Sequence, residues 1–263
     1  MSELPGDDPR DGFHVIIDAG LERADIVLDR PPLNVISMAQ RDQLRRAFEQ
    51  LDEDGRVRII VLRAKGQHFS SGGDIAGFLA APPEEVANLA WNIGAPARCS
   101  KPVIAANRGY CFGAGFELSL ACDFRLTSET CLYALPEQRL GQIPGSGGSA
   151  RLQNMIGITR TKDLVMRAKR ISGRQALDWG IATDCVEDAK LEAATDALAV
   201  ELRAFSPLAQ RAAKKLLNDS EDTAIGAAIE AEGQVYGRLR MSEDFREGVQ
   251  AFAEKRPAKF SGR

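Results

Sequence analysis

The stretch that decides the fold is residues 101–117, KPVIAANRGYCFGAGFE. Its apolar run Pro102–Ala106 is typical of a short buried strand, and a glycine-rich turn then leads directly into the start of a helix at Phe116–Ala121. Strands that alternate with helices in this way are characteristic of α/β proteins. The centre of the chain therefore predicts an α/β body.

The segments upstream of this stretch continue the same pattern. Phe13–Asp18 and Ala24–Asp29 are strand-like runs separated by a turn that contains Gly20, which predicts an opening β-hairpin. Ser37 then precedes a helical stretch, and the β-branched run Arg58–Arg63 follows. Strand, helix and strand in this order indicate a crossover in a parallel sheet, and the apolar run is typical of a strand covered on both faces.

The signals turn helical in the last third of the chain. Ser172 and Gln175 form a capping box, and Pro207 begins a further amphipathic helix. We therefore divide the chain into an α/β core at residues 1–190, which carries the candidate site, and a helical C-terminal region at residues 191–263. An apolar helical tail on a complete α/β core commonly packs on another subunit, so we expect a homo-oligomer.

Length and charge exclude several classes of protein. At 263 residues the chain can bury a full core without disulfides or metal, and we expect order throughout except in the polar segment Met1–Gly12. A formal net charge of −3, with 34 basic residues dispersed among 37 acidic ones, argues against a nucleic-acid-binding protein. No apolar stretch approaches the ~20 residues that cross a membrane, so we expect no membrane partner.

Cysteine and histidine usage indicates a reducing compartment and argues against a metal site. The five cysteines are odd in number and show no CxxC spacing, and the N-terminus lacks the pattern of a secretory signal. We expect a cytoplasmic protein whose reduced cysteines pack in the core. Because His14 and His68 are the only histidines, a zinc site or a histidine-dependent triad is weakly supported, and we expect no metal.

Glu117 is the first candidate for chemistry. It follows Gly113–Gly115 at the start of an apolar helix, where unpaired backbone N–H groups favour negative charge, including an oxyanion that forms during a reaction. A glutamate on a mostly buried helix is unusual, which favours a functional role. The alternative is a surface residue, or one that pairs with Arg108 or Arg151.

Glu137 is the second candidate. It follows Pro136 in an apolar stretch and precedes a turn rich in proline and glycine, a loop position that often places side chains in a binding site. The alternative is a glutamate that stabilises the N-terminus of a helix. The glycine runs Gly72–Gly73 and Gly145–Gly148 match neither a dinucleotide-binding motif nor a P-loop, and no GxSxG elbow is present. A nucleotide site or a serine nucleophile therefore does not explain the two carboxylates.

Several motifs together resemble the crotonase (enoyl-CoA hydratase/isomerase) superfamily. They are Ser70–Ile75, Lys101–Glu117, and Pro136–Glu137 with Leu140–Gly148, extended by Leu28–Asn34 and Glu247–Arg256. The match covers nearly the whole chain in order, so accident is a poor explanation. The resemblance implies a spiral of ββα turns with a C-terminal helical trimerisation region, usually assembled as a trimer or a dimer of trimers.

The resemblance also implies how a thioester is held. In the family two backbone amides bind the thioester carbonyl, and by position these are the N–H groups of Gly73 and Ala114. Alanine replaces the commoner glycine at position 114, which keeps the amide donor. Phe78, Trp91 and Leu135 are candidates to line the acyl site, and the alternative for each is ordinary core packing.

Coenzyme A itself is expected to contact a further set of residues. Backbone around Ser71 and Gly73 would meet the adenine, and Asp74, next to them, would cap the following helix. Tyr236 and Lys255 match positions that contact coenzyme A from a neighbouring subunit in some relatives. The alternative for Lys255 is a solvated charge on a terminal helix.

The presence of both glutamates indicates which of the family's reactions the resemblance implies. Family members with glutamate at the positions of both Glu117 and Glu137 are typically hydratases, which add water across the α,β double bond of an acyl-CoA thioester with these residues as acid and base. No cofactor is implied, because coenzyme A is part of the substrate. An isomerase, a C–C hydrolase or a thioesterase remains the alternative, followed by an RNA-binding or scaffold relative, and the sequence leaves the acyl chain open.

Overall fold

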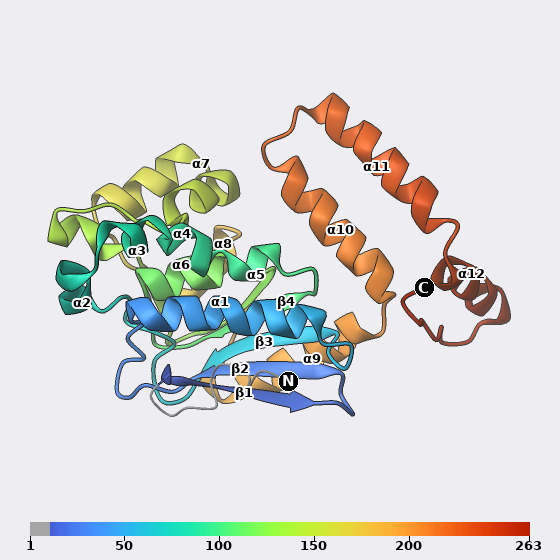
Figure 1. Cartoon of the computed structure of the whole chain (residues 1–263), viewed down its shortest axis with the longest axis horizontal. Coiled ribbons are helices and arrows are strands. Elements are labelled where there is room, and N and C mark those ends of the chain that lie inside the picture. The colour runs from blue at the N-terminus through green and yellow to red at the C-terminus, as the bar shows by residue number, and fades with distance from the viewer. Residues whose placement is uncertain (1–10) are drawn as a thin grey trace.

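A six-stranded sheet forms the centre of the molecule (Figure 1). The structure is a computed structural model that describes residues 11–263, so the expectation for Met1–Gly12 lies almost entirely outside the described residues. The strands lie in the order β1-β2-β3-β4-β6-β9, with β1 and β2 antiparallel and every other neighbouring pair parallel. Their bounds are β1 (Phe13–Asp18), β2 (Arg23–Leu28), β3 (Ile59–Ala64), β4 (Val103–Asn107), β6 (Phe124–Ser128) and β9 (Asp184–Val186).

The predicted hairpin and parallel crossover are both confirmed. β1 pairs with β2 along its whole length, and helix α1 (Met38–Glu53) connects β2 to the parallel β3. The helix begins where the sequence predicts, because the Ser37 side chain accepts a hydrogen bond from the backbone N–H of Gln40 and so caps the first turn. The chain therefore enters α1 at a fixed point, close to the carboxyl end of β2.

The main sheet is covered on both faces, as the apolar run in β3 predicted. Side chains alternate along this strand: Ile60 and Leu62 belong to the larger core, which α1 also fills, whereas Ile59 and Val61 pack in a second core. Helix α9 (Leu191–Arg203) covers that second face with Leu191, Ala199 and Leu202. Two covered faces explain why the strand carries no polar alternation.

A second, three-stranded sheet carries the glycine-rich turn. Its order is β5-β7-β8, with bounds β5 (Tyr110–Phe112), β7 (Leu132–Ala134) and β8 (Ile171–Ser172). β5 leads through Gly113, at a φ of 47°, into helix α6 (Ala114–Leu120). A parallel bridge between Ser70 and Cys111 places the segment after β3 beside β5. Two segments that lie far apart in the sequence therefore meet at the start of α6.

The remaining helices complete the body around these sheets. They are α2 (Ile75–Ala80), α3 (Pro83–Ala87), α4 (Leu89–Ile93), α5 (Ala95–Arg98), α7 (Gly148–Met166) and α8 (Gly173–Asp178), with 3₁₀ turns η2 (Pro136–Leu140) and η3 (Asp188–Lys190). The predicted capping box is confirmed, because Ser172 and Gln175 exchange hydrogen bonds at the start of α8.

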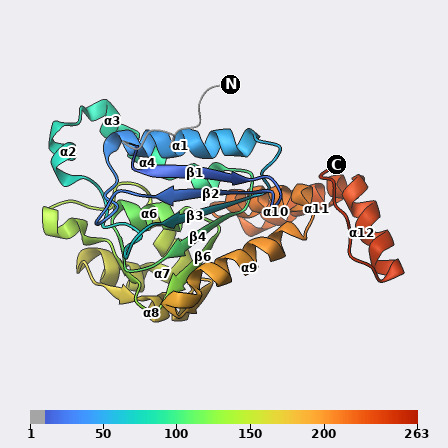
Figure 2. The same cartoon turned by 90° about the horizontal axis from the view of Figure 1, so that it is seen from below.

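Three C-terminal helices extend away from the body. Figures 1 and 2 both show α10 (Pro207–Ser220), α11 (Ile225–Leu239) and α12 (Glu243–Glu254) projecting beyond the sheets. Their large apolar side chains face solvent in the single chain, with more than half of the residue exposed at Ile225, Ile229, Tyr236, Val249 and Phe252. Contiguous exposed apolar surface of this kind is typical of a subunit interface.

A buried lysine ties the projecting helices to the body. Lys214 of α10 is 8% exposed, and its Nζ donates to the backbone oxygens of Pro96 and Lys101, both at 2.8 Å. The same ammonium pairs with Asp123 at 2.7 Å, so all three of its donors are used. The position of α10 relative to the body is therefore specified within one chain.

The predicted boundary between residues 190 and 191 falls before α9. Because α9 packs on the main sheet, the helices that leave the body begin only with α10 at Pro207. The division into a core and an oligomerisation region stays a prediction. All five cysteines are free and buried, as expected. Within residues 11–263, none of the helices combines the length and the apolar character that crossing a bilayer requires.

Candidate active site

Glu117 lies on α6 with its carboxylate inside the protein. The residue is 2% exposed, and its Oε1 accepts hydrogen bonds from the backbone N–H groups of Ser146 at 2.7 Å and Gly148 at 3.1 Å. A Cβ at Gly148 would lie 3.0 Å from the Glu117 Cγ, so glycine permits this close approach. Burial raises the pKa of Glu117, while the two amide bonds and the charge of Arg41 oppose the rise.

The simpler explanations for Glu117 are both wrong. A surface position is excluded by its burial. Arg108 instead bonds the carboxylate of Glu192, at the start of α9, and Arg151 donates to the backbone oxygen of Ser146 at 3.1 Å. Neither arginine pairs with Glu117. A buried carboxylate fixed by two main-chain donors is therefore the feature that needs a functional explanation.

Glu137 lies in the first turn of η2. Burial, reinforced by the negative charge of Glu117, raises the pKa of Glu137 to about 7. Its Oε2 is buried and, among residues 11–263, has no hydrogen-bond partner. Its Oε1 lies 3.1 Å from the position that a Cβ at Gly113 would occupy, beside the start of α6. A carboxyl with a free oxygen that titrates near neutral pH is suited to hold and release a proton.

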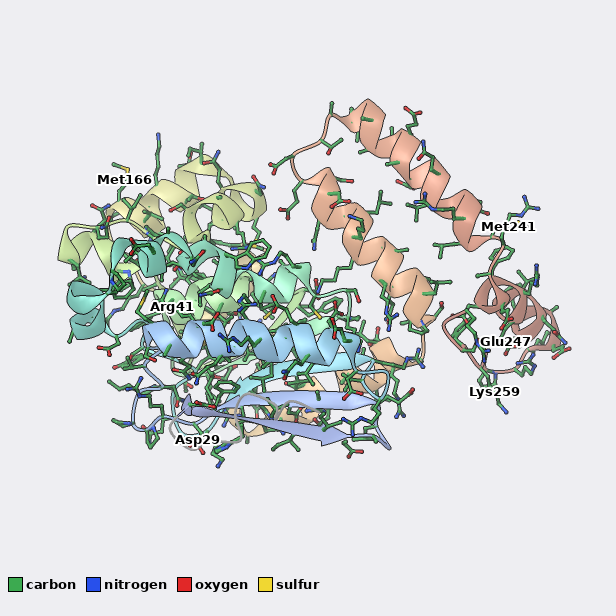
Figure 3. All side chains as sticks on the ribbon, in the orientation of Figure 1. Asp29, Arg41, Met166, Met241, Glu247 and Lys259 are labelled. Carbon is green, nitrogen blue, oxygen red and sulfur yellow. The ribbon has the colours of Figure 1, made fainter. Side chains whose placement is uncertain are left out.

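The charge of Arg41 acts on both carboxylates, and no sequence motif indicated this residue. It lies near the start of α1 (Figure 3), and only 2% of the residue is exposed. Burial lowers the pKa of Arg41 to about 10, and the charges of Glu117 and Glu137 oppose this shift. The side chain therefore stays charged near neutral pH. A signal was present in the sequence, because Arg41 precedes Leu44 by three residues and so stands on the buried stripe of its helix.

Gly73 and Ala114 lie on the two segments that meet at the start of α6. A parallel β-bridge pairs Ile36 with Gly73. Both of its hydrogen bonds involve Ile36, whose N–H donates to Gly72 O at 2.9 Å and whose backbone oxygen accepts from the N–H of Asp74 at 3.1 Å. The N–H of Gly73 therefore points away from the bridge. Ala114 is the first residue of α6, where a backbone N–H has no acceptor within the helix. Both amides are thus available near Glu137.

The neighbours of Gly73 have defined local roles. Asp74 caps α2 as predicted, with Oδ1 accepting from Gly77 N–H at 3.3 Å. The backbone N–H of Ser71 donates to Leu33 O at 2.9 Å. Phe78 of α2 lies over the Arg41 guanidinium, with the ring centre 5.0 Å from Cζ. The contact of Ser71 and Asp74 with coenzyme A stays a prediction.

Other predicted residues lie further from the glutamates or pack in the core. Leu135 is fully buried, whereas Trp91 is 55% exposed and stacks on Arg98. Tyr236 lies on α11, and Lys255 forms the C-terminal cap of α12, so one chain does not bring either residue to the glutamates. Their expected contact with coenzyme A requires a neighbouring subunit and stays a prediction.

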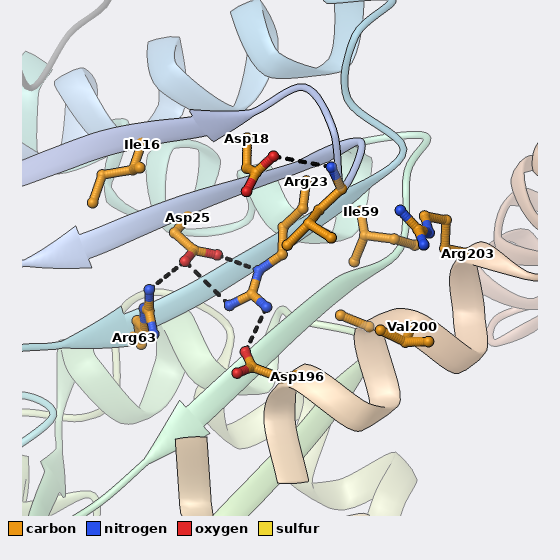
Figure 4. A pocket seen from close by; sticks show the side chains of 11 residues that line it. Ile16, Asp18, Arg23, Asp25, Ile59, Arg63, Asp196, Val200 and Arg203 are labelled. Carbon is orange, nitrogen blue, oxygen red and sulfur yellow. Dashed lines mark hydrogen bonds and ion pairs between the residues drawn. The ribbon is translucent and has the colours of Figure 1, made fainter. Parts of the chain in front are cut away.

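A second polar cluster, within residues 11–263, offers no comparable site. A cavity of about 370 Å³ beside β1, β2, β3 and α9 (Figure 4) is lined by charges that pair with one another, since Arg23 binds Asp25 and Asp196, and Arg63 binds Asp25. In the described part of the chain, no three His, Cys, Asp or Glu side chains gather as metal ligands do. Burial raises the pKa values of three buried thiols to about 12, which argues against a thiolate nucleophile at Cys99, Cys122 and Cys131.

The chain is similar in sequence to known proteins along nearly its whole length. A family model described as enoyl-CoA hydratase/isomerase matches residues 22–263. A probable enoyl-CoA hydratase of Bacillus subtilis is 32% identical over 243 residues, which cover 90% of this chain and 94% of that protein. A carnitinyl-CoA dehydratase of Proteus mirabilis is 34% identical over 250 residues, which cover 91% and 95%.

The solved structures agree with the sequence matches. The crystal structure of an enoyl-CoA hydratase from Bacillus anthracis superposes with a TM-score of 0.90 at 30% identity, covering 96% of this chain and all of that one. The predicted α/β spiral with C-terminal helices is confirmed by this agreement.

Proposed function

The chain belongs to the enoyl-CoA hydratase/isomerase family, and we propose that it is an enoyl-CoA hydratase. The enzyme adds water across the α,β double bond of an acyl-CoA thioester and catalyses the reverse dehydration. One observation carries the proposal: the carboxylate of Glu117 is buried and held by two main-chain N–H groups, while that of Glu137 keeps a free buried oxygen beside the start of α6, where two main-chain donors are available. Hydration requires a base, an acid and a site for negative charge on oxygen.

The thioester oxygen binds between two backbone amides in this proposal. When water adds at Cβ, negative charge develops on the thioester oxygen, and N–H groups fixed in advance stabilise it. Gly73 and Ala114 provide these donors, because neither amide is used by its own bridge or helix. The change from glycine to alanine at 114 leaves the N–H in place. The water oxygen first bonds to Cβ, and one proton is then transferred to Cα.

The environments of the two glutamates favour a division of labour. Glu117 accepts two main-chain hydrogen bonds that favour its ionised form, so it holds the water and removes a proton from it. Burial raises the pKa of Glu137 to about 7, and its Oε2 is buried and free, so Glu137 carries the proton that reaches Cα. Because both carboxyls flank the same water, a single proton relay through the pair is compatible with these roles.

Binding of coenzyme A involves more than one subunit in this proposal. Ser71 and Asp74 approach the adenine within one chain, while Tyr236 and Lys255 come from a neighbour. We propose a homotrimer or a dimer of trimers, supported by the exposed apolar side chains of α11 and α12. Light scattering coupled to size exclusion tests this, and a monomer at micromolar concentration would contradict it. No cofactor takes part, since coenzyme A belongs to the substrate.

The test of the reaction is direct. Purified protein is mixed with crotonyl-CoA, and the loss of the conjugated thioester absorbance is followed together with the formation of 3-hydroxybutyryl-CoA. We expect hydration that depends on both glutamates. Double-bond migration, release of free coenzyme A or cleavage of a carbon–carbon bond, without hydration of any enoyl thioester, would favour another reaction of the family. Binding of RNA at physiological salt by an inactive protein would favour a scaffold role.

A carnitinyl-CoA dehydratase activity is the second candidate, because relatives with that name share about a third of their residues with this chain. The acyl chain of a carnitinyl thioester carries a fixed positive charge. Arg41 places a second positive charge beside the proposed oxyanion site, and like charges repel strongly where water is excluded. This observation favours an uncharged or negatively charged acyl chain.

A further inference from the structure

Among residues 11–263, the charge of Arg41 lies against the Phe78 ring but has no hydrogen-bonded or ion-paired partner. The described part of the chain has three arginines that are less than 9% exposed: Arg23, Arg41 and Arg125. Arg23 pairs with two aspartates, and Arg125 donates to the backbone oxygens of Ser119, Cys122 and Ile181. Within residues 11–263 the guanidinium of Arg41 forms no hydrogen bond or ion pair, and its Nε is completely buried. Arg41 is therefore unlike the other two.

A buried charge is strongly disfavoured unless a counter-charge and hydrogen bonds accompany it. The charges of Glu117 and Glu137 act on Arg41, but no hydrogen bond or ion pair joins either carboxylate to it. The Oε1 of Glu117 is already held by two main-chain N–H groups. The donors of the guanidinium therefore remain available for an anionic group that the described residues do not supply.

The position of Arg41 indicates which part of a ligand would meet it. Its Nη2 lies 2.6 Å from the position that a Cβ at Gly73 would occupy, and a ring carbon of Phe78 lies 2.8 Å from the same point. Gly73 carries an amide that is proposed to bind the thioester oxygen. The phosphates of coenzyme A are separated from that oxygen by the long pantetheine arm. Arg41 therefore faces the acyl end of the ligand.

We propose that Arg41 binds a carboxylate on the acyl chain, so that the substrate is the coenzyme A thioester of an unsaturated dicarboxylic acid. A guanidinium binds a carboxylate through two parallel hydrogen bonds, and the Phe78 ring would shield this pair from water. The inference rests on the proposed hydration. The distal carboxylate takes no part in the bond changes, in which water oxygen bonds to Cβ, Cα gains a proton and the π bond is lost.

The kinetic test compares two substrates of similar length. One is glutaconyl-CoA, which carries a distal carboxylate, and the other is the neutral hex-2-enoyl-CoA. We expect the wild-type protein to favour glutaconyl-CoA in kcat/KM by at least about tenfold. Arg41→Met lowers this ratio by about 10- to 100-fold, as expected when hydrogen bonds to a charged group are lost. Arg41→Lys, which keeps the charge without the planar fork, retains part of the preference.

The readout is the ratio of the two kcat/KM values. Arg41 also acts on Glu117 and Glu137, and any effect through these residues would change the reaction of both substrates alike. Arg46→Met is the matched control, since Arg46 lies on the same helix with 61% of its side chain exposed and pairs only with Asp42. This control is expected to leave both kcat/KM values unchanged. Equal kcat/KM for the two substrates in the wild-type protein would overturn the inference. So would an Arg41→Met variant that loses the same factor on both, as contact with a coenzyme A phosphate predicts.

A binding measurement separates this inference from the reaction. Calorimetric titration with the saturated glutaryl-CoA and hexanoyl-CoA involves no hydration. Tighter binding of glutaryl-CoA that disappears in Arg41→Met supports the carboxylate site even if neither unsaturated thioester is hydrated, in which case the proposed reaction is wrong. Hydration of hex-2-enoyl-CoA without any preference for glutaryl-CoA supports the reaction and rejects the carboxylate site.

Discussion

Replacing Glu137 by glutamine is expected to stabilise the fold while it removes activity. The pKa of Glu137 is about 7 in the folded protein and 4.5 for an unperturbed glutamate, so the folded state binds the proton more tightly than the unfolded chain does. Ionisation therefore destabilises the fold. The effect is absent well below pH 4.5, grows between pH 4.5 and 7, and is constant above about pH 7.

The magnitude follows from the size of the shift. A difference of about 2.5 pH units at 1.36 kcal/mol per unit gives roughly 3 kcal/mol as an upper limit. Because Glu137 is only partly buried, solvent screening reduces this, and we expect Glu137→Gln to raise the free energy of unfolding by about 1–2 kcal/mol at pH 8. Near pH 4.5 most of the difference disappears, since the wild-type carboxyl is then protonated in the folded protein.

The assay is urea unfolding of both proteins at pH 5 and pH 8, at equal protein concentration because of the proposed assembly. Glu129→Gln is the matched control, because Glu129 is exposed and its replacement should change stability by less than about 0.5 kcal/mol at either pH. A Glu137→Gln variant that is no more stable than wild type at pH 8, or equally stabilised at both pH values, would refute the environment assigned to this carboxyl.

Four further expectations concern the same site. Glu117→Gln is expected to lower turnover of crotonyl-CoA by about 10²–10⁴-fold with nearly unchanged binding of coenzyme A, and a variant within twofold of wild type would contradict its role. In the pH profile of hydration, kcat/KM should fall as pH rises through about 7, where free Glu137 loses its proton, and a flat profile from pH 6 to 9 would exclude it as the acid. Gly148→Ala places a methyl group 3.0 Å from Glu117 Cγ and should reduce stability by about 1–3 kcal/mol with a loss of turnover. Gly55→Ala should change neither stability nor turnover, because no atom lies within 4 Å of the position that its methyl group would occupy. Dialysis against a strong chelator should leave hydration unchanged, and activity restored only by added metal would show that a metal takes part.

Local signals predicted the backbone well because they act over a few residues. The opening hairpin, the capping box at Ser172 and the helix start at Ser37 each depend on side chains that bond backbone within the next turn. The buried strand β3 was equally clear, since β-branched side chains point to both of its faces. The division after residue 190 stays a prediction. Helix α9, which follows it, packs on the main sheet, and whether its apolar face would meet a sheet or another subunit cannot be inferred from its own periodicity.

The site was predictable only in part. Glu117 and Glu137 stand out as carboxylates in apolar surroundings, and the family resemblance connects them. The loop that holds Glu117 did not follow from local sequence, because Ser146 and Gly148 act through main-chain N–H groups that any residue type supplies. Arg41 was missed because it lies 76 positions from Glu117, and the isolated sequence does not show that α1 and α6 place their charges around one point.

The buried ammonium of Lys214 has a consequence for how copies of the chain would associate. Rotating α10 out of place would remove all three acceptors of this buried charge at once. The orientation of α10 relative to the body is therefore held firmly. Much of the orientational freedom that a partner would otherwise have to freeze is already lost in the free subunit. Lys214→Met should therefore weaken assembly, so that light scattering shows the oligomer only at higher protein concentration than for wild type.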